Sequence, residues 1–193
     1  MEQEITQSSV KNEAWEWIKA LLIAAVLVFV IRYFIFAPFI VDGPSMQPNF
    51  ETGERLIVNK IVYSIRKPHR GEVVVFHAPE GKDYIKRVIG LPGDKITVEG
   101  DTVSVNGKPI EEQYIKAAVD EMKKNGGLYN TGPGFPNGMV QDGTVPEGSI
   151  FVMGDNRGNS KDGREIGYIP YNKVIGRADV IFWPINNISL VKH

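Results

Sequence analysis

Residues 72–89, EVVVFHAPEGKDYIKRVI, hold two apolar segments, Glu72–His77 and Asp83–Ile89, joined by a short polar connection. Both segments are rich in Val and Ile, and Pro79 and Gly81 lie between them. β-Branched residues favour strands, whereas Pro and Gly favour turns. The stretch therefore predicts two short strands, and short strands of this kind decide the fold class of the chain.

The same pattern recurs in both directions from this stretch. Further strands are predicted over 55–60, 95–99, 102–106, 149–153 and 174–183, with Gly, Pro and Asp between them. The segments KITVEG and GDTVSVNG form a predicted hairpin, because the turn residues of Glu99–Asp101 lie between them. The chain beyond residue 36 is therefore predicted to be a mostly β domain, folded as a barrel or as bent sheets.

Two segments depart from the strand pattern. Residues 111–125, EEQYIKAAVDEMKKN, predict one helix, which Gly126-Gly127 ends. Residues 129–148 contain five glycines and three prolines in twenty residues, which predicts a loop. Such a loop is either a mobile lid or a surface excursion, and the usual behaviour of loops favours the excursion.

The composition excludes several classes of protein. The 193 residues are 42% hydrophobic and 23% charged, with a net charge of −1, so the basic surface that nucleic acid requires is not expected. There is no cysteine, which excludes disulfides, a thiol nucleophile and Cys-based metal sites. His69, His77 and His193 lack the spacing of metal ligands. We therefore expect neither a metal nor a cofactor.

The N-terminal part is strongly apolar. Residues 17–36 read WIKALLIAAVLVFVIRYFIF, and as a helix these twenty residues would rise about 30 Å, the thickness of a bilayer core. We therefore predict a transmembrane anchor over 17–36. A cleaved signal peptide is less consistent with the sequence, because the candidate site at 35–37 lacks a small first residue and Pro38 follows it. A buried helix of a soluble protein is the third interpretation.

The charges that flank this segment predict its orientation. Lys11 and Lys19 lie before the apolar run, and Arg32 lies near its far end. This small bias favours a cytoplasmic N-terminus. Residues 1–16 would then form a cytoplasmic tail, and residues 37–193 would form a β domain outside the cytoplasm.

A stiff turn follows the apolar segment. Residues 41–50 read VDGPSMQPNF, in which Gly43 and two prolines surround Ser45. This serine is either part of the turn chemistry or a nucleophile held in place. A serine hydroxyl is a weak nucleophile and needs a base beside it. His69 and His77 are candidate bases, but neither lies in a pattern that suggests a triad.

Lys86 is another candidate base, because it lies within a predicted apolar strand. Alternation places Lys86 and Arg87 on opposite faces, so one of the two cations faces inward or lies at a strand edge. Burial would lower the lysine pKa from its ordinary value near ~10.4 and make the amine a usable base. From composition alone, an edge lysine that extends to solvent is the simpler interpretation.

The third cluster of polar residues is MGDNRGNSKDGREIG, residues 153–167. It holds two aspartates and two arginines, Asp155, Asp162, Arg157 and Arg164, together with Ser160. Two interpretations are open for this segment, a rigid ion-paired loop and a solvated polar turn.

Together these segments resemble the bacterial type I signal peptidases, membrane-bound Ser/Lys endopeptidases, in their short Gram-positive form. The matching motifs occur in order: Gly43-x-Ser45-Met46-x-Pro48, Gly53-Glu54-Arg55, residues 70–76 (RGEVVVF), residues 84–94 (YIKRVIGLPGD) and residues 154–167 (GDNRxxSxDxRxxG). One such motif would be weak support. The whole set in order, behind an apolar segment, covers nearly the whole chain and is specific.

The resemblance implies a role for individual residues. Ser45 would be the nucleophile, Lys86 the general base, and Ser160 the residue that orients the amine. The expected supporting residues are Arg87, Asp155, Asp162 and Arg164, with Gly43 and Met46 beside the nucleophile. The backbone N–H of Ser45 would donate to the oxyanion.

Three departures from the family pattern are visible. Gly43 stands where some members carry a hydroxyl that serves as a second oxyanion donor. Gly163 replaces a serine of the last motif, and Asn49-Phe50 replaces the usual Thr-Leu.

The resemblance also implies a reaction. The enzyme would cleave secretory preproteins after small residues in an A-x-A pattern, with the substrate extended along residues 40–42 and 83–85. Its partners would be preproteins and membrane lipid, not nucleic acid, and we expect a monomer.

Two alternatives remain at this point. A self-cleaving Ser/Lys repressor would need an Ala-Gly or Cys-Gly bond, and the sequence has neither. A non-catalytic membrane-anchored β domain that binds exported peptides would leave Ser45, Lys86 and Ser160 without a role.

Overall fold

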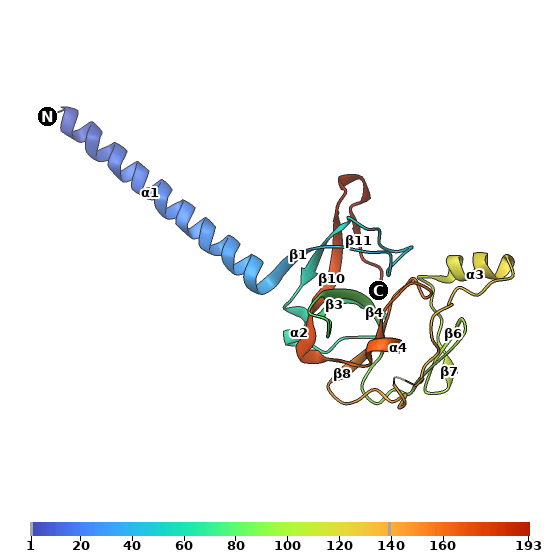
Figure 1. Ribbon diagram of the computed structural model, residues 1–193. Helices are drawn as coiled ribbons and strands as arrows, with labels where there is room; N and C mark the ends of the chain where they lie inside the picture. Colours follow the sequence, from blue (N-terminus) through green and yellow to red (C-terminus); the bar gives the residue numbers. More distant parts are fainter. Residues whose placement is uncertain (1, 139) are drawn as a thin grey trace.

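A long helix projects from a β domain in the computed structural model, which describes residues 2–138 and 140–193 (Figure 1). The helix α1 (Glu2–Val30) continues into a π-helical turn, η1 (Ile31–Ile35). The strands are β1 (Phe36–Ile40), β2 (Arg55–Asn59), β3 (Val73–His77), β4 (Asp83–Gly90), β5 (Ile96–Glu99), β6 (Thr102–Val105), β7 (Lys108–Pro109), β8 (Ser149–Met153), β9 (Ile169–Pro170), β10 (Val174–Trp183) and β11 (Ser189–Leu190). The short helices are α2 (Val62–Ile65), α3 (Lys116–Lys124) and α4 (Gly163–Ile166), with 3₁₀ turns η2 (Tyr171–Lys173) and η3 (Ile185–Asn187).

The described strands form two antiparallel sheets. The larger sheet has the order β1-β2-β10-β3-β4-β8-β9, and β11 pairs with β10. The smaller sheet has the order β5-β6-β7. The mostly β class and the predicted strands are confirmed. The stretch quoted first forms the β3–β4 pair, in which Val74 lies opposite Lys86.

Strand β10 joins the parts of the larger sheet. It pairs with β2, β3 and β11 and contains register shifts. At Gly176 a Cβ atom would lie 2.4 Å from the backbone oxygen of Asn59, so no larger residue fits there. This close approach lets β10 cross from β3 to β2.

Apolar side chains anchor the turn that follows β1. Met46 is completely buried, and Phe50 is 2% exposed. Both pack in a core cluster with Leu56, Val73 and Ile181. The turn is therefore fixed to the sheet by side-chain packing as well as by its prolines.

The N-terminal segment differs from the prediction. The α-helical conformation ends at Val30, and Phe36 already pairs with β2. Among the described residues, no helix is both sufficiently long and sufficiently apolar to cross a membrane. The predicted transmembrane helix over 17–36 is therefore not borne out.

The predicted helix over 111–125 is shorter in the structure. Helix α3 begins at Lys116, and residues 111–115 form an irregular connection. This difference has a physical cause, because Glu112 and the hydroxyl of Tyr114 both accept hydrogen bonds from Arg157, in the polar segment 153–167.

The described residues of 129–148 form the predicted loop, and most of them are exposed or half-buried, but the segment is more than a surface excursion. Phe135 and Val145 are 2% and 1% exposed and belong to one core cluster with Phe151. Phe135 also pairs with Val98 of the smaller sheet. The segment is irregular because of its glycines and prolines, yet its few apolar residues fill the space between the sheets.

This packing predicts a large effect for one substitution in the segment. Phe135→Ala removes a ring whose centroid lies 4.4 Å from the ring centroid of Phe151. The substitution should lower the free energy of unfolding by about 3–5 kcal/mol. Leu128→Ala is the control, because Leu128 is 56% exposed, and it should change stability by about 0.5 kcal/mol or less. Urea unfolding measures both, and equal small effects would contradict the packed arrangement.

Candidate active site

The turn after β1 presents Ser45 to a cleft. Gly43 has a φ of 95°, a conformation that favours glycine, and it directs the chain into the turn. The backbone N–H of Gln47 donates to Pro44 O at 3.0 Å, and that of Asn156 donates to Ser45 O at 3.0 Å. The serine is therefore fixed on both sides by backbone hydrogen bonds.

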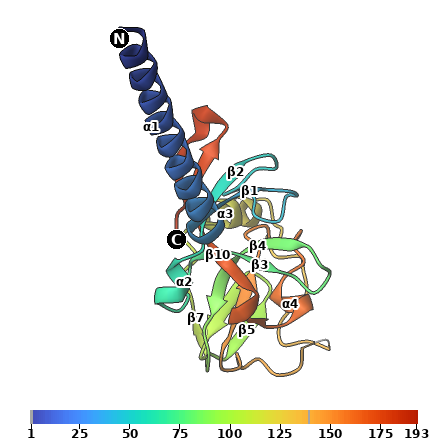
Figure 2. The same cartoon turned by 90° about the vertical axis from the view of Figure 1, so that its left-hand side faces the viewer.

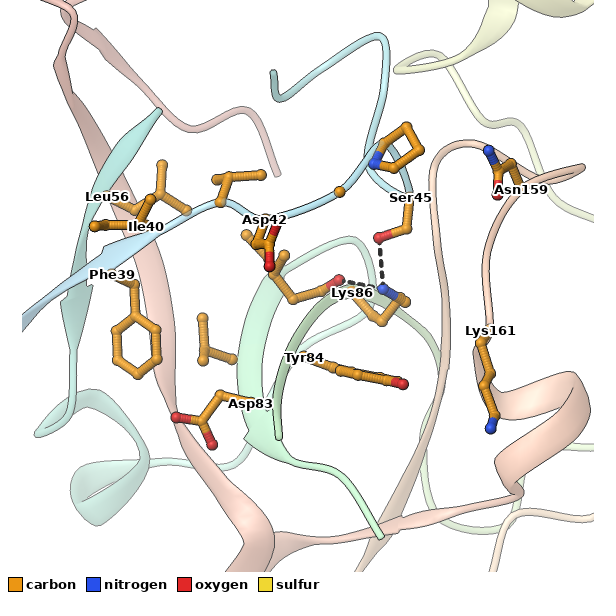
Figure 3. A pocket seen from close by; sticks show the side chains of 15 residues that line it. Phe39, Ile40, Asp42, Ser45, Leu56, Asp83, Tyr84, Lys86, Asn159 and Lys161 are labelled. Carbon is orange, nitrogen blue, oxygen red and sulfur yellow. Dashed lines mark hydrogen bonds between the residues drawn. The ribbon is translucent and has the colours of Figure 1, made fainter. Parts of the chain in front are cut away.

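Lys86 lies beside Ser45 and comes from the interior of β4. Its side chain is buried, and its Nζ atom lies 2.7 Å from Ser45 Oγ and 2.8 Å from Ile85 O (Figure 3). Arg87 is buried as well. The interpretation of Lys86 as an edge lysine that extends to solvent is therefore wrong.

Burial changes the acid–base chemistry of Lys86. It lowers the pKa of this lysine to about 8, because desolvation penalises the ammonium form. The carboxylates of Asp162 and Asp155 act in the opposite direction and raise the pKa. About one amine in ten is then neutral at pH 7. When Lys86 is neutral, the Ser45 hydroxyl can donate its hydrogen to the amine.

A cavity of about 270 Å³ opens at this pair. One part of its wall is apolar and includes Phe39, Ile40, Val41, Leu56, Val75 and Ile85. Asn159 and Lys161 lie on the other side of Ser45 and Lys86 (Figure 3). The cleft therefore has a side rich in apolar residues, which also carries Asp42 and Asp83, and a polar side with Asn159 and Lys161, and the hydroxyl and the amine lie between them (Figure 3).

A buried ion pair supports the site from behind β4. Arg87 donates from Nε and Nη2 to the two carboxylate oxygens of Asp155, at 2.9 and 2.7 Å. Its Nη1 donates to Gly71 O and to Lys192 O. Asp155 is completely buried, so this bidentate pairing satisfies its charge.

A second buried pair lies next to the first. Asp162 caps α4 and accepts hydrogen bonds from Arg164 Nε and Nη2, both at 2.8 Å. One oxygen of Asp162 also accepts a hydrogen bond from Gly154 N at 2.9 Å. The ion-paired interpretation of residues 153–167 is confirmed, and the solvated turn is wrong.

Ser160 does not form the expected bond to the lysine in this structure. Its Oγ atom is buried and has no hydrogen-bond partner among the described residues. The second N–H of Lys86 donates to Ile85 O instead. Ser160 packs against Gly154, where a Cβ would lie 2.1 Å from Ser160 Oγ and 2.5 Å from Ser45 O. Only glycine fits at this contact.

Sequence reasoning missed three supporting residues, Asn49, Tyr129 and Glu112. Asn49 Nδ2 donates to Asp155 Oδ2 at 2.8 Å and to Tyr114 O at 2.9 Å, and so ties the Ser45 turn to the ion pair. Tyr129 donates its hydroxyl to Asp155 O at 3.0 Å. Glu112 pairs with the buried Arg157. Of these residues, only Asn49 stood out in the sequence, because Asn49-Phe50 replaces the usual Thr-Leu of the family pattern.

Neither candidate histidine base lines the cavity at Ser45. His69 is exposed, and His77 is engaged elsewhere. Nδ1 of His77 lies 2.6 Å from Asp83 Oδ1, and both side chains are exposed. In this structure lysine, not histidine, is therefore the base placed beside Ser45.

A serine hydroxyl in contact with a buried lysine of lowered pKa defines a class of site, one suited to nucleophilic catalysis by serine with a lysine base. The comparison with protein families agrees with this class. Residues 14–183 match the family described as signal peptidase, peptidase S26. The chain belongs to this family.

Individual relatives are similar over most of their length. The chain is 40% identical to signal peptidase IB of Staphylococcus aureus, over 93% of this chain and 94% of that one. It is 38% identical to signal peptidase I of Bacillus caldolyticus, over 95% and 97% of the two chains. A crystal structure of a signal peptidase I from Enterococcus faecalis V583 is 36% identical, with a TM-score of 0.52 over 58% of this chain and 97% of that one.

The electrostatics of the site predict the effect of Asp155→Asn. The substitution removes a negative charge that raises the pKa of Lys86 and leaves Arg87 without its counter-charge, so the lysine pKa should fall below about 8. The protein should also lose about 3–5 kcal/mol of stability, because a buried pair is broken. NMR titration of the Lys86 side chain and thermal unfolding measure the two effects.

Asp120→Asn is the matched control for this experiment. Asp120 forms an exposed pair with Lys116 on α3. The substitution should leave both the Lys86 titration and the unfolding temperature almost unchanged. A rise in the lysine pKa in Asp155→Asn would contradict the assignment.

Proposed function

We propose that this chain is a serine endopeptidase that removes signal peptides from secretory preproteins by a Ser/Lys mechanism. The observation that carries the proposal is the 2.7 Å contact between Lys86 Nζ and Ser45 Oγ, between the apolar and the polar side of a cleft. Membership of the signal peptidase family supports the same reaction.

The first step is acylation of the serine. Neutral Lys86 takes the hydroxyl proton as Ser45 attacks the carbonyl of the residue before the cut. The backbone N–H of Ser45 donates to the developing oxyanion. The protonated lysine then gives its proton to the leaving amine, which departs as the new N-terminus of the mature protein.

The second step is deacylation. Lys86, again neutral, takes a proton from a water molecule that attacks the ester, and the proton returns to Ser45 as the signal peptide leaves. Ser160 is proposed to orient the amine in this step, once Ser45 Oγ is acylated and no longer a free hydroxyl. The neighbouring pairs of Arg87 and Asp155 and of Asp162 and Arg164 hold the loop of Ser160 and the strand of Lys86 in place.

The cleft also supports a preference for small residues before the cut. A substrate extended along residues 40–42 and 83–85 would form backbone hydrogen bonds with both segments. Alternate side chains would then point into the apolar part of the cavity, between Leu56 and Ile85. Small apolar side chains would contact this wall, as in the A-x-A pattern.

Three measurements test the mechanism with a peptide that carries an A-x-A site. Ser45→Ala and Lys86→Met should each remove cleavage almost completely, while both proteins remain folded. For the wild type, kcat/KM should rise with pH through about 8, since only the deprotonated amine accepts the serine proton. Normal cleavage by Lys86→Met would refute the lysine base. A folded wild type that binds the peptide without cleaving it would favour the non-catalytic binding domain.

We infer that the protein attaches to a membrane through α1, with the β domain outside the cytoplasm. The side chains of Leu21, Leu22, Val26 and Phe29 are all more than half exposed on the projecting helix. Exposed apolar residues also cover the tip formed by the end of β10, η3 and β11, which are Trp183, Ile185, Ile188 and Leu190. Both α1 and this tip extend upward from the β domain in the two views (Figure 1 and Figure 2). Lipid is the partner that would cover both apolar surfaces.

Vesicle flotation tests this attachment. The double variant Leu22→Arg with Val26→Arg should leave the vesicle fraction, because an arginine in lipid costs about 3 kcal/mol. Met122→Arg on α3 is the control, since Met122 is 41% exposed at the far end of the β domain from α1 (Figure 1). The control should float like the wild type. Flotation of the double variant would contradict attachment through α1.

A further inference from the structure

The polar side of the active-site cleft has no role in the mechanism above. Asn159 and Lys161 line the cavity across from Leu56 and Ile85, and both are exposed. Phe39, Ile40 and Leu56 lie on one side of the Ser45–Lys86 pair, and Asn159 and Lys161 lie on the other (Figure 3).

The Ser45–Lys86 pair lies at the bond to be cut, so it divides a bound substrate into the residues before the cut and the residues after it. In the proposed mode of binding, residues before the cut occupy the side of the cleft with Phe39, Ile40 and Leu56. Because the bound chain is extended at Ser45, the residues after the cut must pass along the opposite side of the cleft. They therefore meet Asn159 and Lys161.

The positively charged side chain of Lys161 forms an ion pair with a residue from a distant part of the chain. Its Nζ atom ion-pairs with Glu80, in the turn between β3 and β4. The hydroxyl of Tyr84 donates to the other oxygen of Glu80. The side chains of Lys161 and Glu80 are 49% and 37% exposed, and exposed pairs of this kind contribute little to stability. Lys161 can therefore exchange Glu80 for another carboxylate at small cost.

We propose that Lys161 is a specificity-determining residue that favours an acidic side chain at the second residue after the scissile bond of the substrate. This inference rests on the proposed function and extends it to the mature side of the preprotein. An acidic side chain there takes the place of Glu80 on the Lys161 ammonium, whereas a basic side chain meets like charge.

The test compares peptides that share one A-x-A site and carry Glu, Gln or Lys at the second residue after the cut. For the wild type, kcat/KM should be about two- to fivefold higher for the Glu peptide than for the Lys peptide. The ratio should approach one in Lys161→Gln and invert in Lys161→Glu. It should increase in Glu80→Gln, because Lys161 then has no resting partner. Added salt should reduce the wild-type ratio.

Lys82→Gln is the matched control. Lys82 lies in the turn that carries Glu80, is exposed and does not line the cavity. Its removal should leave the Glu-to-Lys ratio unchanged. A ratio that is the same in the wild type and in Lys161→Glu, with the Gln peptide cleaved by both, would overturn this inference and leave the proposed function intact. If no form cleaves the Gln peptide, the proposed function fails, and this inference fails with it.

Discussion

The burial of the Lys86 amine next to Ser45 is the constraint on which the rest of the site depends. A pKa lowered from 10.5 to about 8 corresponds to about 3 kcal/mol of unfavourable environment for the ammonium. Because the folded protein binds this proton more weakly than the unfolded chain, the cost is complete below pH 8 and disappears as pH rises toward the ordinary lysine value. Other interactions of the fold, in the sheet that surrounds β4, must offset this cost.

The charges of the groups around Lys86 must therefore offset one another, so that the lysine pKa stays low. Asp155 and Asp162 both raise the lysine pKa, and without their arginine partners they would raise it further. The structure pairs them as Arg87 with Asp155 and Arg164 with Asp162, each with two carboxylate contacts. Paired charges have weak fields at a distance, so desolvation remains the main effect on Lys86. The pairs also leave the loop little freedom to move, because breaking one leaves a buried charge.

The site is also held by parts of the chain that carry no catalytic motif. Asn49 joins the serine turn to Asp155 and to Tyr114, and Tyr129 reaches the backbone of Asp155. These tyrosines lie on either side of α3, in connections between the smaller sheet and β8. The smaller sheet therefore supports the geometry of Ser45 and Lys86 across the domain, while the cleft remains open on the side that faces solvent.

The sequence alone determined most of the strands and the order of the motifs, because these depend on local periodicity and on short patterns around Ser45, Lys86 and Asp155. The roles proposed for Ser45 and Lys86 rest on the resemblance of these patterns to a family, since periodicity left the choice of base open. The sequence did not determine where α3 begins or how residues 129–148 pack, because Glu112 and Phe135 are fixed by contacts with distant residues. The length of the N-terminal helix and the absence of a bond to Ser160 likewise came only from the structure. The choice between an exposed and a buried Lys86 was decided in the same way. Both interpretations satisfy the alternation of a strand, and only the neighbours across the sheet determine which side chain loses its water.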